Sequence, residues 1–388
     1  MRLTVTLEQR FRMTPDGRAW TEGTYRHSFW DSYLEVFDEV RVSGRALEVP
    51  ARQNGDHEVT GPQVSFAPLP HYLGPREYVL MARKIKAATK KLVAEPGAYL
   101  FRVPSPLSVS AAKHLAGRPY GLEVLGNPSE AIKAATDRSG GILGRMAASQ
   151  LREQCRNAVC VSFVTKQVLQ RAYPAASGTL SISCSDVMLS PTAFASSPKV
   201  FKGGPLRLCF IGAMEVPYKG QEVLLQAYRK LVDLGVVREL VLLGEGRKRA
   251  DFQAYALSLG LKDKAVFKGF LSDPDLVRQE LDSSDLFVLP SFTEGLPRAG
   301  IEAMARGLPC VCSSVGGIVE LLDEKQMVPV RDAEALTGRI AWMAENPDEM
   351  NVAAARNLAK AHEYEKELMH AKRLVFLKYL RDRTEFVS

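Results

Sequence analysis

Two glutamates eight residues apart offer the clearest chemistry in this chain. Glu294 and Glu302 lie in the stretch 290–305, which reads PSFTEGLPRAGIEAMA. Two carboxylates at this spacing could act as acid and base in a hydrolysis, or they could accept hydrogen bonds from the hydroxyls of a ligand. The structural alternative is that Glu294 caps a helix and Glu302 lies on its solvated face. The segments around the pair decide between these interpretations.

The elements around the two glutamates predict where they lie. Residues 286–289 (LFVL) form a short apolar run that is typical of a buried parallel strand. Apolar residues then recur at helical spacing between positions 301 and 305. We therefore expect Glu294 in the loop beyond a strand's carboxyl end and Glu302 in the second turn of the next helix. The free N–H groups of that helix would face the same crevice.

Length and composition predict two globular domains. The chain has 388 residues, of which 46% are hydrophobic and 24% charged, and this is too long for one ordinary core. It contains no run of about 18 apolar residues and no N-terminal apolar core of signal-peptide length, so we expect a cytoplasmic protein. Its six cysteines show no C-x-x-C spacing, which argues against zinc sites and disulfides.

The net charge of +7 is unevenly distributed along the chain. Residues 76–118 contain nine Lys or Arg against two Glu, and residues 81–93 have the pattern of a basic amphipathic helix. One interpretation is a solvated helix face. The other is docking on an anionic membrane surface, with the protein peripheral on the inner face of the membrane. Nucleic-acid binding is not expected, because no aromatic-rich RNA signature, zinc finger or helix-turn-helix pattern accompanies the charge.

Strands and helices alternate through the second half of the chain. This alternation predicts a parallel, doubly wound sheet with ligands beyond the carboxyl ends of its strands. The first half also alternates, and residues 185–205 are rich in Ser, Pro and Gly. We expect two Rossmann-like α/β domains that face each other across a cleft. The expected parts are an acceptor-binding domain (1–195), a nucleotide-sugar-binding domain (205–365) and a C-terminal helix (366–388) that packs back on the first domain.

The strand ends of the second domain carry residues suited to a nucleotide diphosphate. Lys219 follows a long loop that begins at Gly212 and opens a helix, which suits a phosphate group. Gly244 and Gly246 would let the backbone approach a ligand closely. The third Gly of a dinucleotide fingerprint is missing there. At Phe270 a nucleotide base could lie against apolar surface.

These motifs, in this order and spacing, resemble family 4 of the retaining nucleotide-sugar glycosyltransferases, which have the two-domain GT-B fold. The resemblance covers about residues 206–336. It implies that Glu302 accepts hydrogen bonds from the ribose and that Glu294 binds hydroxyls of the transferred sugar. It also implies that Lys219 binds the diphosphate, with Glu294 and Lys219 as the catalytic pair. Three residues would line the sugar and phosphate: Gly295, Leu296 and Pro297.

The chain departs from the family pattern in three places. Ala213 stands where the family usually carries an Arg, so either Arg247, Arg298 or a residue of the first domain is expected as the second phosphate cation, or donor binding is weak. The first strand is followed by the loop 12–20 in place of a Gly-Gly turn. No counterpart of the family's cleft histidine is evident. The expected substitutes on the acceptor side are Asn127 and Glu123.

The resemblance implies the transfer of a hexosyl unit from a nucleoside-diphosphate sugar to a hydroxyl acceptor, with retention of the anomeric configuration. UDP is the first choice of nucleotide. The acceptor is expected to be a lipid-linked or saccharide intermediate of bacterial polysaccharide or glycolipid assembly. We expect no metal and no cofactor, because a lysine and helix N-termini can neutralise the diphosphate and no Asp-x-Asp motif occurs in this region. The alternatives are a nucleotide-sugar epimerase, a phosphorylase, or an inactive sugar-nucleotide-binding homologue.

Overall fold

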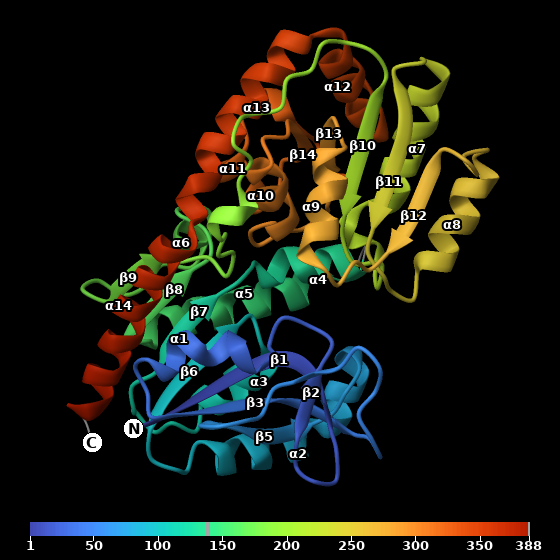
Figure 1. Cartoon of the computed structure of the whole chain (residues 1–388). Helices are drawn as coiled ribbons and strands as arrows, with labels where there is room; N and C mark the ends of the chain where they lie inside the picture. Colours follow the sequence, from blue (N-terminus) through green and yellow to red (C-terminus); the bar gives the residue numbers. More distant parts are fainter. Residues whose placement is uncertain (137–139, 387–388) are drawn as a thin grey trace. The chain divides into compact units, whose positions relative to one another are not determined.

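The computed structural model of this chain describes residues 1–136 and 140–386 (Figure 1). The described residues form two compact units. The first contains Met1–Pro128, Arg145–Cys184 and the C-terminal residues from His370. The second contains Ser185–Met369 and the described part of Ser129–Gly144. The division after Cys184 precedes the segment 185–205, where the sequence suggested the boundary.

Segment 185–205 belongs to the second unit because it is anchored there at Leu189. The side chain of Leu189 is buried in that unit's core. Its backbone N–H donates to the Tyr364 carbonyl at 2.9 Å, and its carbonyl accepts from the Lys366 N–H at 2.9 Å. A segment rich in turn-forming residues is therefore part of a folded body and not a free linker.

The first unit is built on a nine-stranded sheet. Strands β1, β3, β5, β6, β7, β8 and β9 run parallel, whereas β2 pairs antiparallel with β1, and β4 pairs antiparallel with β2. The strands are β1 (Arg2–Met13), β2 (Ala19–Thr21), β3 (Glu39–Glu48), β4 (His57–Glu58), β5 (Val64–Pro70), β6 (Ala98–Val103), β7 (Gly121–Val124), β8 (Cys160–Phe163) and β9 (Leu180–Ser183).

Helices connect most of the parallel strands of this unit. The helices of this half of the chain are η1 (His27–Trp30), α1 (Asp31–Leu34), α2 (Gly74–Leu92), α3 (Pro106–Ala112), α4 (Pro128–Thr136), α5 (Gly140–Asn157) and α6 (Val168–Ala172). The basic segment expected to be helical lies in α2 except for its last residue, Val93, which caps the helix; the buried side of α2 is formed by Ile85, Thr89 and Leu92.

The expectation of a loop at 12–20 is wrong at both of its ends. Strand β1 continues to Met13 and pairs antiparallel with β2, so only the residues between them form a turn. The Thr14 N–H donates to the Arg18 carbonyl at 3.0 Å, and Gly17 has a φ of 81°. The residues Thr-Pro-Asp-Gly favour a hairpin turn, in which Gly adopts the left-handed conformation without strain.

The last helix contributes to the core of the first unit. Helix α14 (Lys366–Glu385) begins in the second unit, and its residues from His370 onward belong to the first. Phe376, Leu377 and Leu380 are buried in one cluster with Leu3 and Val5 of β1. The C-terminal part of this helix therefore packs on the N-terminal sheet.

The second unit is a six-stranded parallel sheet of order β12-β11-β10-β13-β14-β15. The direction of strand addition reverses between β10 and β13, which are neighbours, and ligands of such sheets bind outside the carboxyl ends at this switch point. All four residues of β13 are buried, as expected for a strand covered on both faces. The strands are β10 (Leu206–Ile211), β11 (Val237–Leu243), β12 (Ala265–Gly269), β13 (Leu286–Leu289), β14 (Cys310–Ser313) and β15 (Met327–Val328).

Helices flank this second sheet (Figure 1). Their apolar sides pack with the strands into one core, which includes Leu224, Tyr228 and Ile301. The helices are η2 (Pro191–Ala193), η3 (Pro217–Lys219), α7 (Gln221–Asp233), α8 (Arg249–Ser258), α9 (Pro274–Asp282), α10 (Arg298–Ala305), α11 (Ile318–Leu321), η4 (Glu324–Gln326), α12 (Ala333–Glu345), α13 (Pro347–Ala361) and η5 (His362–Tyr364).

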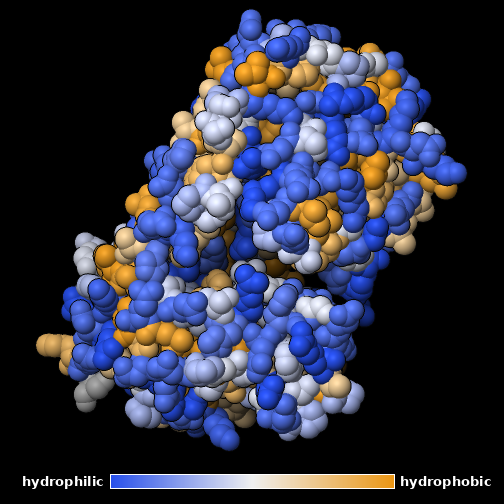
Figure 2. Space-filling view, in the orientation of Figure 1, coloured by the Kyte–Doolittle hydropathy of each residue, from blue (hydrophilic) through white to orange (hydrophobic). Residues whose placement is uncertain are grey.

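The surface in Figure 2 is hydrophilic for the most part, with apolar atoms in small patches. None of the helices in the described part of the chain combines the length and the apolar character that crossing a bilayer requires.

Candidate functional site

Lys219 and Glu294 meet at the switch point of the second sheet. Lys219 ends the short helix η3 that follows β10, and Glu294 lies in the loop that follows β13. The Lys219 Nζ donates to Glu294 Oε1 at 2.6 Å. Both side chains are largely buried, with 17% and 7% of their surface exposed. Residues 75 positions apart thus form one ion pair at the expected ligand edge.

The loop of Lys219 is held against the loop of Glu294 by a glycine. Gly220 has a φ of 77°, and a Cβ on it would come within 2.0 Å of the Pro290 carbonyl oxygen. Beside this contact, the Phe292 N–H donates to the Tyr218 carbonyl at 2.7 Å. Only glycine permits this approach, and the approach sets the spacing between Lys219 and Glu294.

The loop after β14 holds the Glu294 segment from another side. Gly316 has a φ of 52°, and a Cβ on it would lie 1.8 Å from the Glu294 carbonyl oxygen. The next residue, Gly317, donates its N–H to the Gly295 carbonyl at 2.8 Å. Contacts from two neighbouring loops therefore hold the backbone that carries Glu294.

We predict that Gly220→Ala damages the site more than a glycine change with the same backbone conformation elsewhere. Gly260 is the matched control, because its φ is 72° but no atom lies within 4 Å of a Cβ placed there. Gly260→Ala should cost about 1 kcal/mol of stability through backbone strain alone. Gly220→Ala should cost about 2–3 kcal/mol or more, since the Pro290 backbone must also move.

Urea unfolding of both variants measures this difference. UDP binding, measured by calorimetry on the folded proteins, should weaken in Gly220→Ala only. Equal losses of stability and equal UDP affinities in the two variants would contradict the role assigned to this contact.

Gly244 and Gly246 pack on protein backbone. A Cβ on Gly244 would lie 2.0 Å from the Gly212 carbonyl oxygen, and one on Gly246 would lie 2.2 Å from the carbonyl carbon of Met214. The loops after β10 and β11 are further joined by the Met214 N–H, which donates to the Glu245 carbonyl at 2.8 Å. These glycines therefore bring two loops together, which is a reason for glycine that the sequence does not reveal.

The two candidate phosphate cations differ in their surroundings. The Arg247 Nε donates to Glu215 Oε1 at 2.7 Å, so this exposed guanidinium is already paired. Arg298 is exposed at the first position of α10. Ala213 is exposed, and its carbonyl accepts from Gln221 Nε2 at 2.9 Å. Arg298 is thus the better candidate for an incoming anion, because among the described residues it forms no ion pair that the anion would have to displace.

Glu302 lies in the second turn of α10, as expected. Burial raises the pKa of its carboxyl, and the positive charge of Arg298 acts in the opposite direction. Hydroxyl groups of a bound ligand would donate hydrogen bonds to this carboxyl. These bonds would stabilise its ionised form, which can only accept.

The remaining donor-side residues lie at the same carboxyl edge. Gly295 and Leu296 are partly buried, and Pro297 is the buried N-cap of α10. Phe270 directly follows β12, and its side chain is 67% exposed. An aromatic side chain this exposed offers a surface on which a planar base could stack.

Of the two candidates on the acceptor side, Glu123 is in a buried network. It is 5% exposed, accepts a hydrogen bond from the Tyr33 hydroxyl at 3.0 Å and pairs with the guanidinium of Arg102. The structure therefore gives Glu123 a role in holding the first unit together. Asn127 follows β7 and is partly buried, and its Oδ1 accepts from the Tyr173 hydroxyl at 2.6 Å.

Arg331 is a feature of this edge that sequence reasoning missed. It follows β15, has a φ of 64°, and its guanidinium lies 4.6 Å from the centroid of the Phe292 ring. A non-glycine residue with positive φ is uncommon and marks a constrained position. The contact joins a third loop to the Glu294 segment, and no local sequence signal predicts it.

Metal binding has no evident candidate site at this edge. Within the residues that the structure describes, no three His, Cys, Asp or Glu side chains gather so that they could hold a metal ion. That transfer proceeds without a metal stays a prediction.

Comparison with known proteins finds relatives of this chain, and the family model that matches lies in its second unit. Residues 194–361 match the family model described as Glycosyl transferases group 1, which confirms a resemblance to glycosyltransferases in this region, whereas family 4 and the retaining mechanism stay predictions. Protein CapJ of Staphylococcus aureus is 27% identical over 323 residues, which cover 81% of this chain and 79% of CapJ. The putative colanic acid biosynthesis glycosyltransferase WcaL of Escherichia coli K12 is 30% identical over 49% of each chain.

A solved structure shows the same fold over nearly the whole length. Anabaena Alr3699/HepE in complex with UDP superposes with a TM-score of 0.63 at 15% identity, covering 96% of this chain and 98% of that one. The expected fold class is confirmed: this is an α/β protein of the GT-B type with two Rossmann-like units.

Proposed function

We propose that this chain is a retaining glycosyltransferase that moves a hexosyl unit from a nucleoside-diphosphate sugar to a hydroxyl acceptor. The observation that carries the proposal is the Lys219–Glu294 ion pair at the switch point between β10 and β13. It lies inside the region that matches the glycosyl transferases group 1 model. Relatives named as glycosyltransferases of polysaccharide biosynthesis support the reaction class.

In this proposal the Lys219 ammonium neutralises the diphosphate as it leaves. The bond between the sugar's anomeric carbon and the phosphate oxygen breaks, and a bond to the acceptor oxygen forms on the same face. The acceptor's proton passes to a phosphate oxygen of the departing nucleotide. Glu294 holds sugar hydroxyls and keeps Lys219 in position through the 2.6 Å contact. Positive charge placed in advance is the main catalytic contribution.

UDP is the proposed nucleotide, and a lipid-linked or saccharide intermediate is the proposed acceptor. The solved structure of HepE contains UDP, which supports the first choice. The printed name of WcaL refers to colanic acid biosynthesis, which supports a role in bacterial polysaccharide or glycolipid assembly. Glu302 would bind the ribose, and Phe270 would face the base.

A thermal-shift screen over UDP-, GDP- and ADP-sugars tests the donor, because a ligand that binds only the folded state raises its melting temperature. The sugar nucleotide with the largest shift is then incubated with mono- and oligosaccharide acceptors, and the anomeric configuration of the product is read by NMR. The proposal expects a product with the donor's configuration. Epimerisation without an acceptor, or donor binding with neither transfer nor hydrolysis, would contradict it.

We predict that UDP affinity depends on the ionisation of Glu302. Because burial raises the pKa of this carboxyl, lowering the pH protonates it earlier than an ordinary glutamate. UDP affinity should therefore fall as the pH drops through the raised pKa. Calorimetry between about pH 5 and 8 measures this, and Glu302→Gln should bind more weakly with a flatter profile. An unchanged profile in that variant would remove Glu302 from the ribose site.

The carboxyl of Glu302 also makes the free energy of unfolding depend on pH. The native state binds the proton more tightly than the unfolded state, so this contribution to stability falls as the pH rises between the ordinary and the raised pKa. Affinity and stability should thus change in opposite directions with pH in this window.

We also propose that α2 docks on an anionic membrane surface. Val79 and Leu80 are 70% and 80% exposed on this helix. Six basic residues lie exposed on it with them: Arg76, Arg83, Lys84, Lys86, Lys90 and Lys91. This combination of apolar and basic side chains is typical of helices that lie in a bilayer interface.

Co-sedimentation with vesicles that contain phosphatidylglycerol tests the docking. Binding should fall as salt rises, and Leu80→Ser should weaken it several-fold. Leu257→Ser is the matched control, because Leu257 is also an exposed helical leucine, at 58%, but lies on α8. Absence of binding at low salt would refute the proposal.

A further inference from the structure

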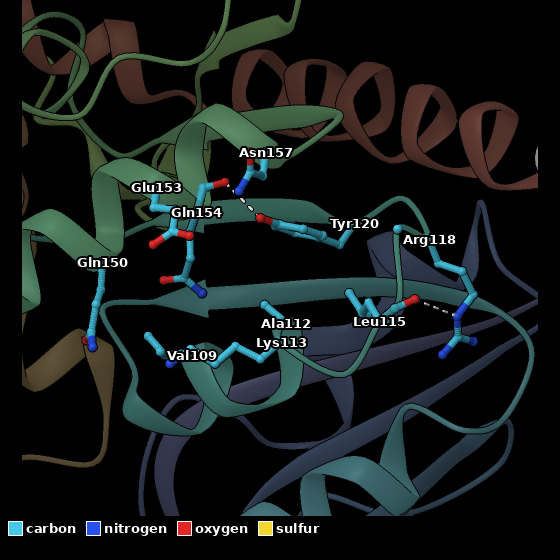
Figure 3. A pocket seen from close by; sticks show the side chains of 11 residues that line it. Val109, Ala112, Lys113, Leu115, Arg118, Tyr120, Gln150, Glu153, Gln154 and Asn157 are labelled. Carbon is cyan, nitrogen blue, oxygen red and sulfur yellow. Dashed lines mark hydrogen bonds between the residues drawn. The ribbon is translucent and has the colours of Figure 1, made fainter.

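A cavity of about 500 Å³ lies in the first unit between α3, the segment that follows it, and α5 (Figure 3). Its wall includes Tyr120, which directly precedes β7, and Asn157, the last residue of α5. The cavity is therefore at the amino-terminal edge of the parallel sheet. Asn127, proposed for the acceptor side, follows β7 at the opposite edge. The cavity is thus separate from the residues assigned to transfer.

A buried amide in the cavity wall has an unused donor. Gln154 is 7% exposed, and within the described residues its Nε2 has no hydrogen-bond partner. Figure 3 shows this side chain extending from α5 toward α3, into the space between the two helices. The backbone carbonyl of Gln154 accepts from the Tyr120 hydroxyl at 3.0 Å, so the main chain at this position is held in place. A buried unpaired donor costs about 1–3 kcal/mol, and a ligand acceptor would recover that energy.

The charges around the cavity do not favour an ion of either sign. Arg118 is engaged, because its guanidinium donates to the carbonyls of Leu115, Glu95 and Val93. Lys113 and Glu153 are both exposed at the wall and carry opposite charges. The C-terminal ends of α3 and α5 add partial negative charge. A neutral, polar ligand therefore fits better than a phosphate or a metal ion.

The wall combines amides with apolar surface. Gln150, Gln154 and Asn157 each offer donors and an acceptor, and Val109 and Leu115 supply apolar contacts. A sugar ring presents hydroxyls at its edge and C–H groups on its faces, so it can use both kinds of contact. The volume lies in the range of ligand pockets, about 300–1,000 Å³.

We propose that this cavity binds a neutral saccharide of about two rings, at a site distinct from the donor edge. The site goes beyond the proposed transfer reaction, and binding there requires neither donor nor catalysis. The saccharide is either a free oligosaccharide or a section of a growing glycan chain, and both present the same hydroxyl chemistry.

Saturation-transfer NMR and calorimetry with maltose, cellobiose and N,N′-diacetylchitobiose test the proposal on the full chain. At least one disaccharide should bind, and Gln154→Leu should weaken its binding about tenfold. Saturating UDP should leave the binding unchanged. Maltohexaose, compared with maltose, separates the sources: tighter binding of the longer glycan indicates a chain, and equal binding indicates a free sugar.

The controls separate binding from folding. Gln154→Leu removes an unpartnered amide at similar volume, so its melting temperature should not fall. Asn157→Ala changes an exposed residue at the wall and should also weaken binding, whereas Arg156→Ala, exposed on the same helix and outside the cavity wall, should not. The proposal is overturned if no disaccharide binds, if UDP competes with it, or if Gln154→Leu and Asn157→Ala bind as the unmodified chain does.

Discussion

Lys219→Ala is expected to lower the rate of sugar transfer by about 100- to 1,000-fold, because it removes the charge that stabilises the departing diphosphate. UDP affinity should fall as well, since the ammonium at the switch point contributes to ground-state binding. The measurements are transfer at saturating donor and UDP calorimetry. Lys230→Ala, which removes an exposed lysine of α7 paired with Glu334, should change neither.

A second variant separates chemistry from folding. In Lys219→Ala the carboxylate of Glu294 is left largely buried without its 2.6 Å partner, which destabilises the loop by itself. The double variant Lys219→Met/Glu294→Gln removes both charges and should recover stability but not transfer. Recovery of transfer in the double variant, or unchanged UDP affinity in the folded single variant, would remove Lys219 from the reaction.

Glu123→Ala is expected to destabilise the first unit by about 3–5 kcal/mol. Arg102 is 1% exposed and pairs with Glu123, so the variant removes a buried carboxylate from beside a buried guanidinium. Tyr33→Phe removes a hydroxyl that donates to the carboxylate and accepts from Arg102 Nη1 at 3.1 Å, but it leaves both charges in place and should cost about 1–2 kcal/mol. The network lies beside Trp30, whose ring centroid is 5.3 Å from that of Tyr33. The fluorescence of Trp30 can therefore report on unfolding.

Urea unfolding followed by tryptophan fluorescence measures this in a Trp342→Phe background. The remaining tryptophans, Trp20 and Trp30, are both in the first unit, so their signal follows that unit alone. Glu39→Ala is the control, because its pair with Arg2 lies in the same unit, is exposed and should contribute less than about 1 kcal/mol. A loss in Glu123→Ala as small as that of the control would show that the buried pair is not structural.

Local patterns in the sequence were sufficient for most elements of the second unit. The apolar run at Leu286–Leu289 and the helical spacing after Pro297 place Glu294 in a loop and Glu302 on a helix, as the structure has them. Hydrophobic periodicity is a local property, so it can be read from the sequence without knowledge of the fold. The hairpin around Gly17 was missed because pairing between β1 and β2 depends on register, although its turn residues were visible.

The α/β class, the order of the strand-end motifs and the residues worth testing follow from the sequence. Which of these residues meet depends on the folded chain. Lys219 pairs with Glu294 because β10 and β13 are neighbours in the sheet, although the residues are 75 positions apart. Glu123 is committed to Arg102 by the same kind of long-range contact. Strand order and register set these pairings, and no local stretch of the chain determines either of them.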